Sequence, residues 1–160
     1  MMEQPDNTTS PFGHTHLPAS EKADRVQSVF TSVSEHYDTM NDWMSLGLHY
    51  SWKKQAISYS HLYPGDIALD LACGTCDITY YLKKRYPQQV SFYCGDPNIS
   101  MLERGKNLLL DHGEFENLTF FQHYAEEMPY ISNSLALVIC GFGFRNFTSK
   151  EKALSEIYRV

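Results

Sequence analysis

The sequence predicts an α/β protein built on a doubly wound parallel sheet behind a helical N-terminal cap. Apolar residues recur at helical spacing between about residues 21 and 59, and from residue 67 onward short apolar runs alternate with helical segments. That alternation is typical of parallel strands joined by crossover helices. We therefore expect a flexible lead at 1–20, a helical cap at 21–62 and the α/β domain at 63–160.

The N-terminal third is expected to be helical after a polar lead. Three prolines and mostly polar side chains in the first 20 residues leave no apolar face to bury, so we expect this lead to be flexible. Beyond it, apolar residues form stripes at helical spacing, and Gly47 marks the end of the second stripe. The expected cap helices are 21–33, 40–46 and about 50–59.

Each strand of the sheet is marked by a short apolar run. Ile67-Ala68-Leu69-Asp70-Leu71 has the nearly continuous apolar character of a strand buried on both faces. In a Rossmann-like sheet this first strand lies between the second and the fourth. Thr148 and Glu151 form a capping box that predicts the start of a last helix. The expected strands are 67–71, 91–94, 118–122 and 135–140, with helices at 77–85 and 98–110.

Composition and charge limit the classes of function. The chain has 160 residues, 42% of them apolar, and its formal net charge of −6 disfavours nucleic acid as a partner. The longest apolar run, 135–140, is far shorter than the ~18 residues that suggest a membrane span, and the N-terminus lacks a signal-peptide layout. We therefore expect a cytoplasmic protein whose four cysteines are thiols.

The first strand ends in the segment DLACGTCD, residues 70–77, where a buried strand turns sharply into a helix. A ligand can meet backbone N–H groups at such a turn, and Gly74 permits a close approach because it has no Cβ. Asp96 follows the second strand, where an acidic side chain can accept hydrogen bonds from both hydroxyls of a ribose. The alternative for Asp96 is a turn or helix-cap role before Pro97.

Several motifs taken together resemble the UbiE-type methyltransferases of ubiquinone and menaquinone biosynthesis. Residues 37–53, YDTMNDWMSLGLHYSWK, resemble the signature YDxMNDxMSxGxHxxWK of that family. Five shorter segments resemble, in the same order, its cofactor motif, acidic-loop motif, adenine-side AExxPF loop, FGxRN motif and YRV segment. These segments are 70–77, 96–102, 125–130, 141–146 and 158–160.

The resemblance implies a C-methyltransferase that uses S-adenosylmethionine and no metal. Its substrate would be a polyprenyl benzoquinol or a demethylmenaquinol, a lipid, so peripheral contact with the inner face of a membrane is expected. Arg145 and Asn146 would face the quinol, with Arg145 stabilising developing negative charge or, alternatively, forming a salt bridge. The residues expected at the cofactor are Gly74 and Thr75 at its amino-acid part, Asp96 at the ribose, Tyr124 and Ala125 at the adenine, and Gly141.

Apolar residues of the cap are candidates for a prenyl-tail channel, although ordinary helix packing explains them equally. His49 is either a proton acceptor or a structural histidine. The channel candidates are Met40, Trp43, Met44, Leu46, Leu48 and Trp52.

The chain also departs from the family pattern. Cys76 replaces the last glycine of the cofactor motif and is expected to crowd the methionine part of the cofactor. Tyr124 and Gly141 replace residues that normally supply polar contacts, and Tyr50 replaces an arginine. The family continues beyond residue 160, so we expect an α/β domain that is incomplete at its C-terminal side, with its fourth strand at an open edge. A fragment, a degenerate product or an assembly completed by a homodimer or another chain would each explain this, and the alternative function is an inactive S-adenosylmethionine-binding remnant.

The cysteines and histidines allow further alternatives. Cys73 and Cys76 form a C-x-x-C at a strand-to-helix junction, the placement of a thioredoxin-like redox pair. All four cysteines follow or end strands at one edge of the expected sheet, so a four-thiolate zinc site is conceivable. His14 and His16 lack a third ligand nearby, which favours solvated side chains.

Overall fold

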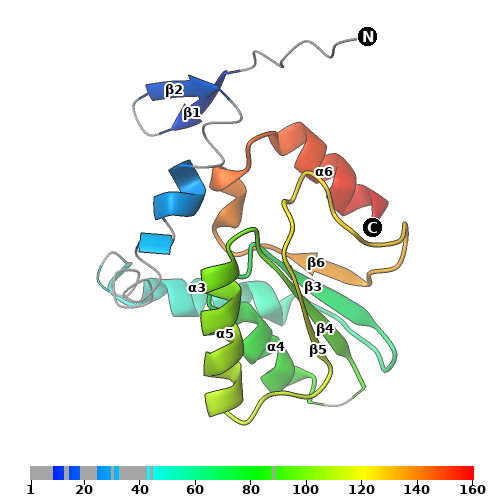
Figure 1. Ribbon diagram of the computed structural model, residues 1–160. Coiled ribbons are helices and arrows are strands. Elements are labelled where there is room, and N and C mark those ends of the chain that lie inside the picture. The colour runs from blue at the N-terminus through cyan, green and yellow to red at the C-terminus, as the bar shows by residue number, and fades with distance from the viewer. Residues whose placement is uncertain are drawn as a thin grey trace.

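A four-stranded parallel sheet forms the centre of the computed structural model, which describes residues 9–12, 15–18, 25–29, 31–32, 43, 45–87 and 89–160. The strand order is β5-β4-β3-β6, so the first strand of the sheet lies between the second and the fourth, as predicted. Figure 1 shows this arrangement. The strands are β3 (Ile67–Leu71), β4 (Ser91–Gly95), β5 (Leu118–Phe121) and β6 (Leu137–Ile139).

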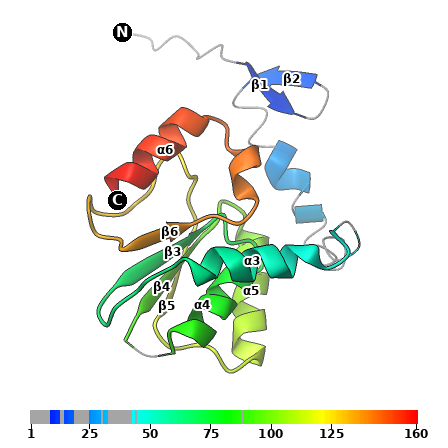
Figure 2. The same ribbon diagram turned by 180° about the vertical axis from the view of Figure 1, so that it is seen from behind.

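Helices cover both faces of this sheet, which confirms the doubly wound α/β fold. The helices α3, α4 and α5 lie on one face and α6 lies on the other, as the two opposite views show (Figures 1 and 2). The short 3-10 helix η1 follows β6. The helices are α3 (Leu48–Ser58), α4 (Asp77–Arg85), α5 (Ile99–Asp111), η1 (Gly143–Asn146) and α6 (Lys150–Arg159).

The alternation of side chains along each strand sorts the apolar residues into two cores. Ala68 and Phe92 point to the face covered by α3 and α4, where they pack with Leu82. Their neighbours Leu69 and Tyr93 point to the opposite face, in the core that includes α6. Because both faces are buried, β3 contains no exposed residue.

Near the N-terminus, Thr9–Phe12 (β1) and Thr15–Pro18 (β2) pair as antiparallel strands, which the sequence analysis did not predict. Their two-residue separation includes Gly13, a spacing typical of hairpins. Residues 25–29 and 31–32 are helical, within the helix expected at 21–33. Residues 33–42 and His14 lie outside the described part of the chain.

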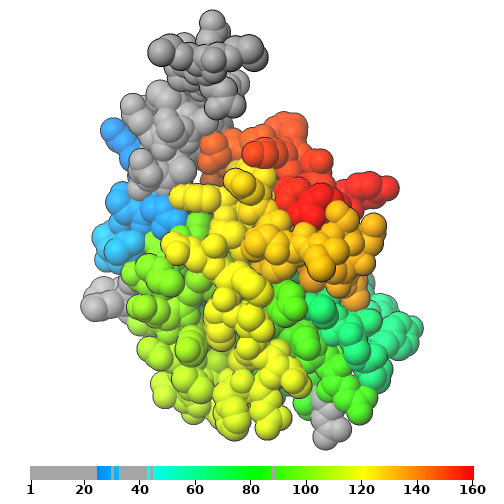
Figure 3. Space-filling model, turned by 45° about the vertical axis from the view of Figure 1, so that its right-hand side comes forward, coloured from blue at the N-terminus to red at the C-terminus, as the bar shows by residue number. Residues whose placement is uncertain are grey.

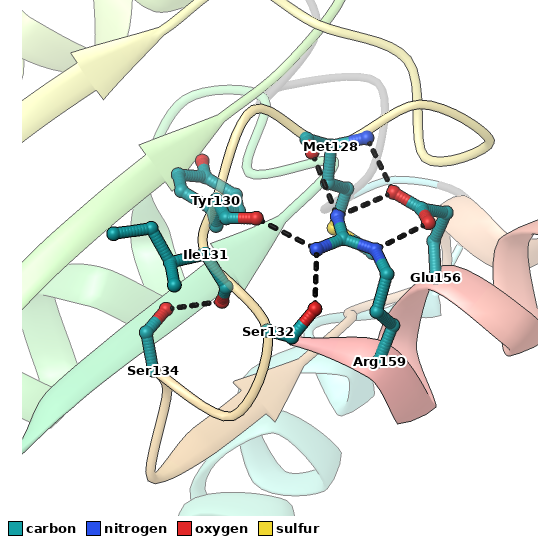
Figure 4. Close-up of polar contacts among 7 residues, drawn as sticks. All are labelled: Met128, Tyr130, Ile131, Ser132, Ser134, Glu156 and Arg159. Atoms are coloured by element: carbon teal, nitrogen blue, oxygen red, sulfur yellow. Dashed lines mark hydrogen bonds and ion pairs between the residues drawn. The ribbon is translucent and has the colours of Figure 1, made fainter.

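The loop that joins β5 to β6 (residues 122–136, the β5–β6 loop) is fastened to α6. In Figure 3 it covers one side of the molecule, in yellow and light orange, between α5 and the C-terminal residues. Arg159 at the end of α6 donates from its guanidinium to the backbone carbonyls of Met128 at 2.9 Å and Tyr130 at 2.7 Å (Figure 4). The Arg159 side chain therefore holds the loop by its backbone.

Glu156 completes this fastening. Its carboxylate accepts a hydrogen bond from the Met128 N–H at 2.9 Å and pairs with the Arg159 guanidinium at 2.6 Å (Figure 4). Hydrogen bonding to Arg159, followed by the Met128 N–H, lowers the pKa of Glu156 to about 2. The ionised carboxylate is thus stabilised in the folded state.

The other end of α6 is capped differently from the prediction. Ser149, and not Thr148, is the N-cap, and its hydroxyl accepts from the Lys152 N–H at 3.3 Å. The capping box between Thr148 and Glu151 was therefore wrong. The backbone N–H groups of Thr148 and Ser149 donate instead to the carboxylate of Glu126 in the β5–β6 loop. Both ends of α6 thus hold this loop.

We predict that Arg159→Met lowers the thermal midpoint by roughly 3–8 °C, because two loop carbonyls lose their charged donor. Lys152→Met, an exposed change on the same helix, is the control and should leave the midpoint nearly unchanged. Calorimetry measures both.

The contribution of Glu156 should depend on pH. A carboxylate with a lowered folded-state pKa stabilises the fold above its unfolded value of about 4.3, and this gain disappears as the pH falls toward about 2. Wild type should therefore exceed Glu156→Gln in thermal midpoint at pH 7, with the difference closing between about pH 4 and 2. A difference that does not change with pH would contradict the role of the ionised form.

Candidate functional site

The carboxyl ends of β3 and β4 are tied together by one carboxylate. Asp96 follows β4, and its Oδ2 accepts a hydrogen bond from the Gly74 N–H at 2.9 Å. Its Oδ1 accepts from the Asn98 N–H at 2.8 Å. Burial raises the pKa of Asp96, and these two N–H donors oppose that rise. Each carboxylate oxygen keeps a second lone pair with which it can accept a ligand hydroxyl.

The helix-cap role considered for Asp96 belongs to Asn98. The Oδ1 of Asn98 accepts from the Met101 N–H at 3.1 Å and so caps α5. Its side-chain amide donates to the Gln27 carbonyl at 3.1 Å and to the Thr31 hydroxyl at 2.9 Å. This single side chain therefore holds the N-terminal helical segment against the start of α5, beside Asp96.

A cavity opens at this edge of the sheet, and we call it the nucleoside-side cavity. The space within it, counted together with its open mouth, is about 800 Å³. Loops after β3, β4, β5 and β6 and the N-terminal helical segment surround it. Its polar and small lining residues include Gly74, Asp96, Tyr124, Ala125, Gly141 and Asn146.

His123 positions the backbone of this cavity. The ring is buried and lies between the Tyr124 carbonyl, 3.0 Å from Nδ1, and the Tyr130 hydroxyl, 2.8 Å from Nε2. A carbonyl can only accept, so Nδ1 donates and Nε2 accepts from Tyr130. Burial lowers the pKa of His123, which favours this neutral form. Sequence analysis missed His123, although its place directly after the third strand was a usable signal.

A second cavity adjoins the first and is more strongly charged; we call it the α3–α4 cavity. It shares Ala72, Gly74, Gly141 and Phe142 with the nucleoside-side cavity. The rest of its lining comes from α3 and Ser45 before it, from the end of β3 and the turn that follows, from the start of α4 and from η1. The Lys53 Nζ of α3 lies 2.7 Å from the Asp77 carboxylate at the start of α4. Its lining also includes His49, Asp70, Thr75 and Arg145.

Asp70 is a buried acid in the wall of the α3–α4 cavity. Its Oδ2 accepts from the backbone N–H of Thr79 at 3.0 Å and from the Thr79 hydroxyl at 2.8 Å. Its Oδ1 has no hydrogen-bond partner in the described part of the chain. Burial, then the nearby Cys94, raises the pKa of Asp70 to about 8. At neutral pH this side chain is therefore mostly protonated.

Three of the four cysteines gather beneath the turn after β3. The Sγ atoms of Cys73 and Cys76 lie 3.7 Å apart, and Cys94 packs beside Cys76. Burial raises the pKa of the Cys73 thiol well above its ordinary range, which leaves little of the reactive thiolate that a redox pair uses. Cys140 belongs to the α6 side, so the four cysteines do not converge as one site. The described residues include no group of three or more side chains placed to hold a metal ion.

Comparison with known proteins decides the family. Residues 19–160 match the ubiE/COQ5 methyltransferase family. The chain belongs to this family.

Curated relatives within the family are about two-fifths identical to the chain over the aligned residues. A protein of Legionella pneumophila (strain Corby) is 41% identical over 152 residues, which are 95% of this chain and 61% of the relative. One of Methylococcus capsulatus is 42% identical over 155 residues, 97% of this chain and 62% of the relative. Both are named ubiquinone/menaquinone biosynthesis C-methyltransferase UbiE. The chain thus spans about three-fifths of their length.

Solved structures agree on the fold. An S-adenosylmethionine-dependent methyltransferase from Aquifex aeolicus superposes with a TM-score of 0.62 at 20% identity, over 71% of this chain and 60% of that one. The YcgJ protein of Bacillus subtilis gives a TM-score of 0.61 at 22% identity, over 68% of this chain and 44% of that one. At such identities the likeness concerns architecture alone.

The ubiE/COQ5 motifs meet at the two cavities. Asp96, Tyr124 and Ala125 line the nucleoside-side cavity and Thr75 lines the α3–α4 cavity. Gly74 and Gly141 lie where the two adjoin. Arg145 and Asn146 are neighbours on η1, yet Arg145 lines the α3–α4 cavity and Asn146 the nucleoside-side cavity. The expected roles of these residues remain predictions.

Cys76, which departs from the ubiE/COQ5 pattern, does not narrow either cavity. Its side chain is fully buried and packs toward Leu109 of α5, Cys94 and Gly105. A Cβ added at Gly105 would lie 2.6 Å from the Cys76 Sγ. The expected crowding of the cofactor site by Cys76 is thus absent, because a glycine in α5 provides the room. Tyr124 lies at the cavity edge, half exposed, and does not fill it.

The structure describes only part of the cap signature of the family: Tyr50 lies within the described residues and Met44 lies outside them. Tyr50 lies in α3 with its ring 4.0 Å from that of His49. His49 is buried and lines the α3–α4 cavity. Met40 and Met44 lie outside the described residues. None of the described helices is long and apolar enough to cross a membrane.

We predict that Gly105→Ala destabilises the protein by about 1–3 kcal/mol, because the added methyl overlaps the Cys76 thiol. In a Cys76→Gly background the same change should lower the free energy of unfolding by less, because the sulfur is gone and alanine favours the helix. Urea unfolding of the two single variants and the double variant measures this coupling. Equal costs in both backgrounds would show that Cys76 is not the obstacle.

Proposed function

We propose that the chain binds S-adenosylmethionine across the two adjoining cavities and forms part of a C-methyltransferase. The observation that carries this proposal is the buried carboxylate of Asp96, which faces the nucleoside-side cavity while hydrogen-bonded to the Gly74 backbone. It combines an acceptor for vicinal hydroxyls with a glycine turn open to a ligand. A Cβ added at Gly74 would meet nothing within 4 Å, so the turn has open space at this position.

The two cavities suit the two halves of this cofactor. Asp96 would accept hydrogen bonds from the ribose hydroxyls, and Tyr124 and Ala125 would flank the adenine. Gly74 and Thr75 would contact the amino-acid part in the α3–α4 cavity. Because Gly74 and Gly141 belong to both cavities, a ligand that extends across them would pass between these two glycines.

For the reaction, we propose methyl transfer to a ring carbon of a lipid quinol, as the names of the relatives indicate for those proteins. The bound cofactor would supply an electrophilic sulfonium methyl group. Arg145, exposed on η1, would stabilise negative charge on a quinol oxygen because its guanidinium stays protonated. Asn146 would orient the ring by hydrogen bonding.

The prenyl tail of such a substrate would lie against apolar side chains of the α3–α4 cavity. Trp52 of α3 and Phe142 before η1 lie with ring centroids 6.0 Å apart, and both line the α3–α4 cavity. Each is about half exposed, and Leu48, one helical turn before Trp52 on α3, is exposed as well. Aromatic and aliphatic side chains of this kind suit a flexible apolar ligand and peripheral contact with a membrane.

Cofactor binding is tested by calorimetry with S-adenosylmethionine and S-adenosylhomocysteine. We expect binding by the wild-type chain and a loss of about a hundredfold or more in Asp96→Ala, because two hydrogen bonds to a charged acceptor disappear. Asp111→Ala, an exposed change at the end of α5, is the matched control. Unchanged affinity in Asp96→Ala would refute the placement of the ribose.

The methyl-transfer step needs a second measurement. A short-chain demethylmenaquinol and a radiolabelled methyl donor would report turnover, which Arg145→Met should lower at least tenfold without altering cofactor affinity. Cofactor binding without any turnover would instead favour a binding remnant.

A further inference from the structure

Cys73 and Cys76 are the first and last residues of a hydrogen-bonded turn, and the proposed methyl transfer does not use their thiols. The Cys76 N–H donates to the Cys73 carbonyl at 2.8 Å, so residues 73–76 form a β-turn after β3. The two outer Cα atoms of such a turn lie less than about 7 Å apart. A disulfide joins Cα atoms that are roughly 4.4–6.8 Å apart, so this backbone can accept one with little movement.

Both sulfur atoms lie near the same atom of this turn. The Cys73 Sγ is 4.0 Å and the Cys76 Sγ 3.9 Å from the Gly74 carbonyl oxygen, and the two sulfurs are 3.7 Å apart. An S–S bond is about 2.0 Å long, so the sulfurs have to approach by about 1.7 Å. Cys73 is the partner that can move, because it is only partly buried, whereas Cys76 packs fully buried against Leu109.

A small reagent can reach one of these sulfurs through the α3–α4 cavity. Cys73 lines that cavity, whereas Cys76 and Cys94 are fully buried. Burial raises the pKa of the Cys73 thiol, so its thiolate is scarce at neutral pH, which disfavours rapid catalytic exchange. Slow oxidation needs only this small thiolate fraction. The pair therefore combines one thiol that a reagent can reach with a buried second thiol beside it.

We propose that Cys73 and Cys76 are a modification site at which a peroxide forms a disulfide across the turn. The Cys73 thiolate attacks one oxygen of hydrogen peroxide, hydroxide leaves, and Cys73 becomes a sulfenic acid. The Cys76 thiol then attacks the Cys73 sulfur, and the hydroxyl group leaves as water with the Cys76 proton. Two thiols and one peroxide thus give one disulfide and two molecules of water. A dithiol reductant reverses the bond by thiol–disulfide exchange.

Cys94 is the third thiol of this cluster and the competing partner among the described residues. It packs beside Cys76, and its Sγ lies 3.4 Å from the Thr79 hydroxyl. Cys94 belongs to β4, which pairs with β3 in the middle of the sheet. A bond to Cys94 would have to shift a residue of a paired strand, whereas a bond between Cys73 and Cys76 moves only the turn. We therefore expect the bond within the turn.

Peptide mapping after peroxide treatment distinguishes these pairings. After the remaining thiols are alkylated, trypsin releases Cys73 and Cys76 together in peptide 55–83, Cys94 in 86–104 and Cys140 in 107–145. Peptide 55–83 contains no methionine or tryptophan, so an oxidative change in its mass reports its two cysteines. We expect this peptide to lose two hydrogen atoms and to escape alkylation, and a dithiol reductant should restore both thiols.

Other peptide maps would overturn the proposal. A cross-link between peptides 55–83 and 86–104 would show that Cys94 is the partner. Added oxygen atoms on 55–83 without the loss of two hydrogens would show that no second thiol resolves the sulfenic acid. An unmodified 55–83 after prolonged exposure to peroxide would show that the reagent does not reach Cys73.

Variants test the role of each thiol. In Cys76→Ser the sulfenic acid has no partner in the turn, so peptide 55–83 should gain oxygen atoms in place of the disulfide. Cys94→Ser, a change within the same cluster, and Cys140→Ser, a change outside it, are the controls and should keep the disulfide. Loss of the disulfide in Cys94→Ser would contradict direct pairing of Cys73 with Cys76.

A ligand in the α3–α4 cavity should protect this site, because it would cover the Cys73 thiol. This step alone rests on the proposed function. With S-adenosylhomocysteine at about ten times its Kd, the rate of disulfide formation should fall about tenfold. If calorimetry detects no S-adenosylhomocysteine binding but the disulfide forms, the proposed function fails and the modification site stands. Binding without protection would show that peroxide reaches Cys73 by another route, which contradicts access through this cavity.

Discussion

The hydrogen bond between the Gly74 N–H and the Asp96 carboxylate is the constraint on which both cavities depend. The turn after β3 has positive φ at Ala72, Gly74 and Cys76, conformations that non-glycine residues rarely adopt. Asp96, itself oriented by the Asn98 N–H, fixes this turn from the end of the neighbouring strand. The parallel pairing of β3 with β4 brings the donor and acceptor together, and the fixed turn is the shared wall of the two cavities.

Another wall of the nucleoside-side cavity is formed by a loop without regular secondary structure. The β5–β6 loop carries Tyr124 and Ala125, and α6 holds it from both ends, through Glu126 at the start of the helix and through Arg159 at its end. His123 adds a hydrogen bond to the Tyr124 carbonyl. In these contacts, side chains satisfy backbone groups of the loop. They therefore hold an irregular segment in the fixed position that a ligand site needs.

Buried polar groups with partly unused capacity concentrate at the same edge of the sheet. Asp70 and Asp96 are both buried and both have a raised pKa. Both oxygens of Asp96 accept from backbone N–H groups, whereas one oxygen of Asp70 has no partner among the described residues. The thiols of Cys76 and Cys94 are buried and fill the space behind the turn, whereas Cys73 is partly buried and lines the α3–α4 cavity. The carboxyl groups therefore line the cavities, and the thiols of Cys76 and Cys94 serve as packing.

The sequence by itself determined the family and the order of the four parallel strands and of the helices α4 and α5 between them. Local apolar periodicity located β3 and α4 to the residue, because burial on both faces leaves a continuous apolar run and the turn residues are distinctive. Only the tertiary structure decided which polar groups are satisfied. The hydrogen bonds that Glu126 accepts at the start of α6 and the room that Gly105 gives Cys76 each depend on residues distant in sequence. Such pairings arise from packing between elements, which no local pattern records.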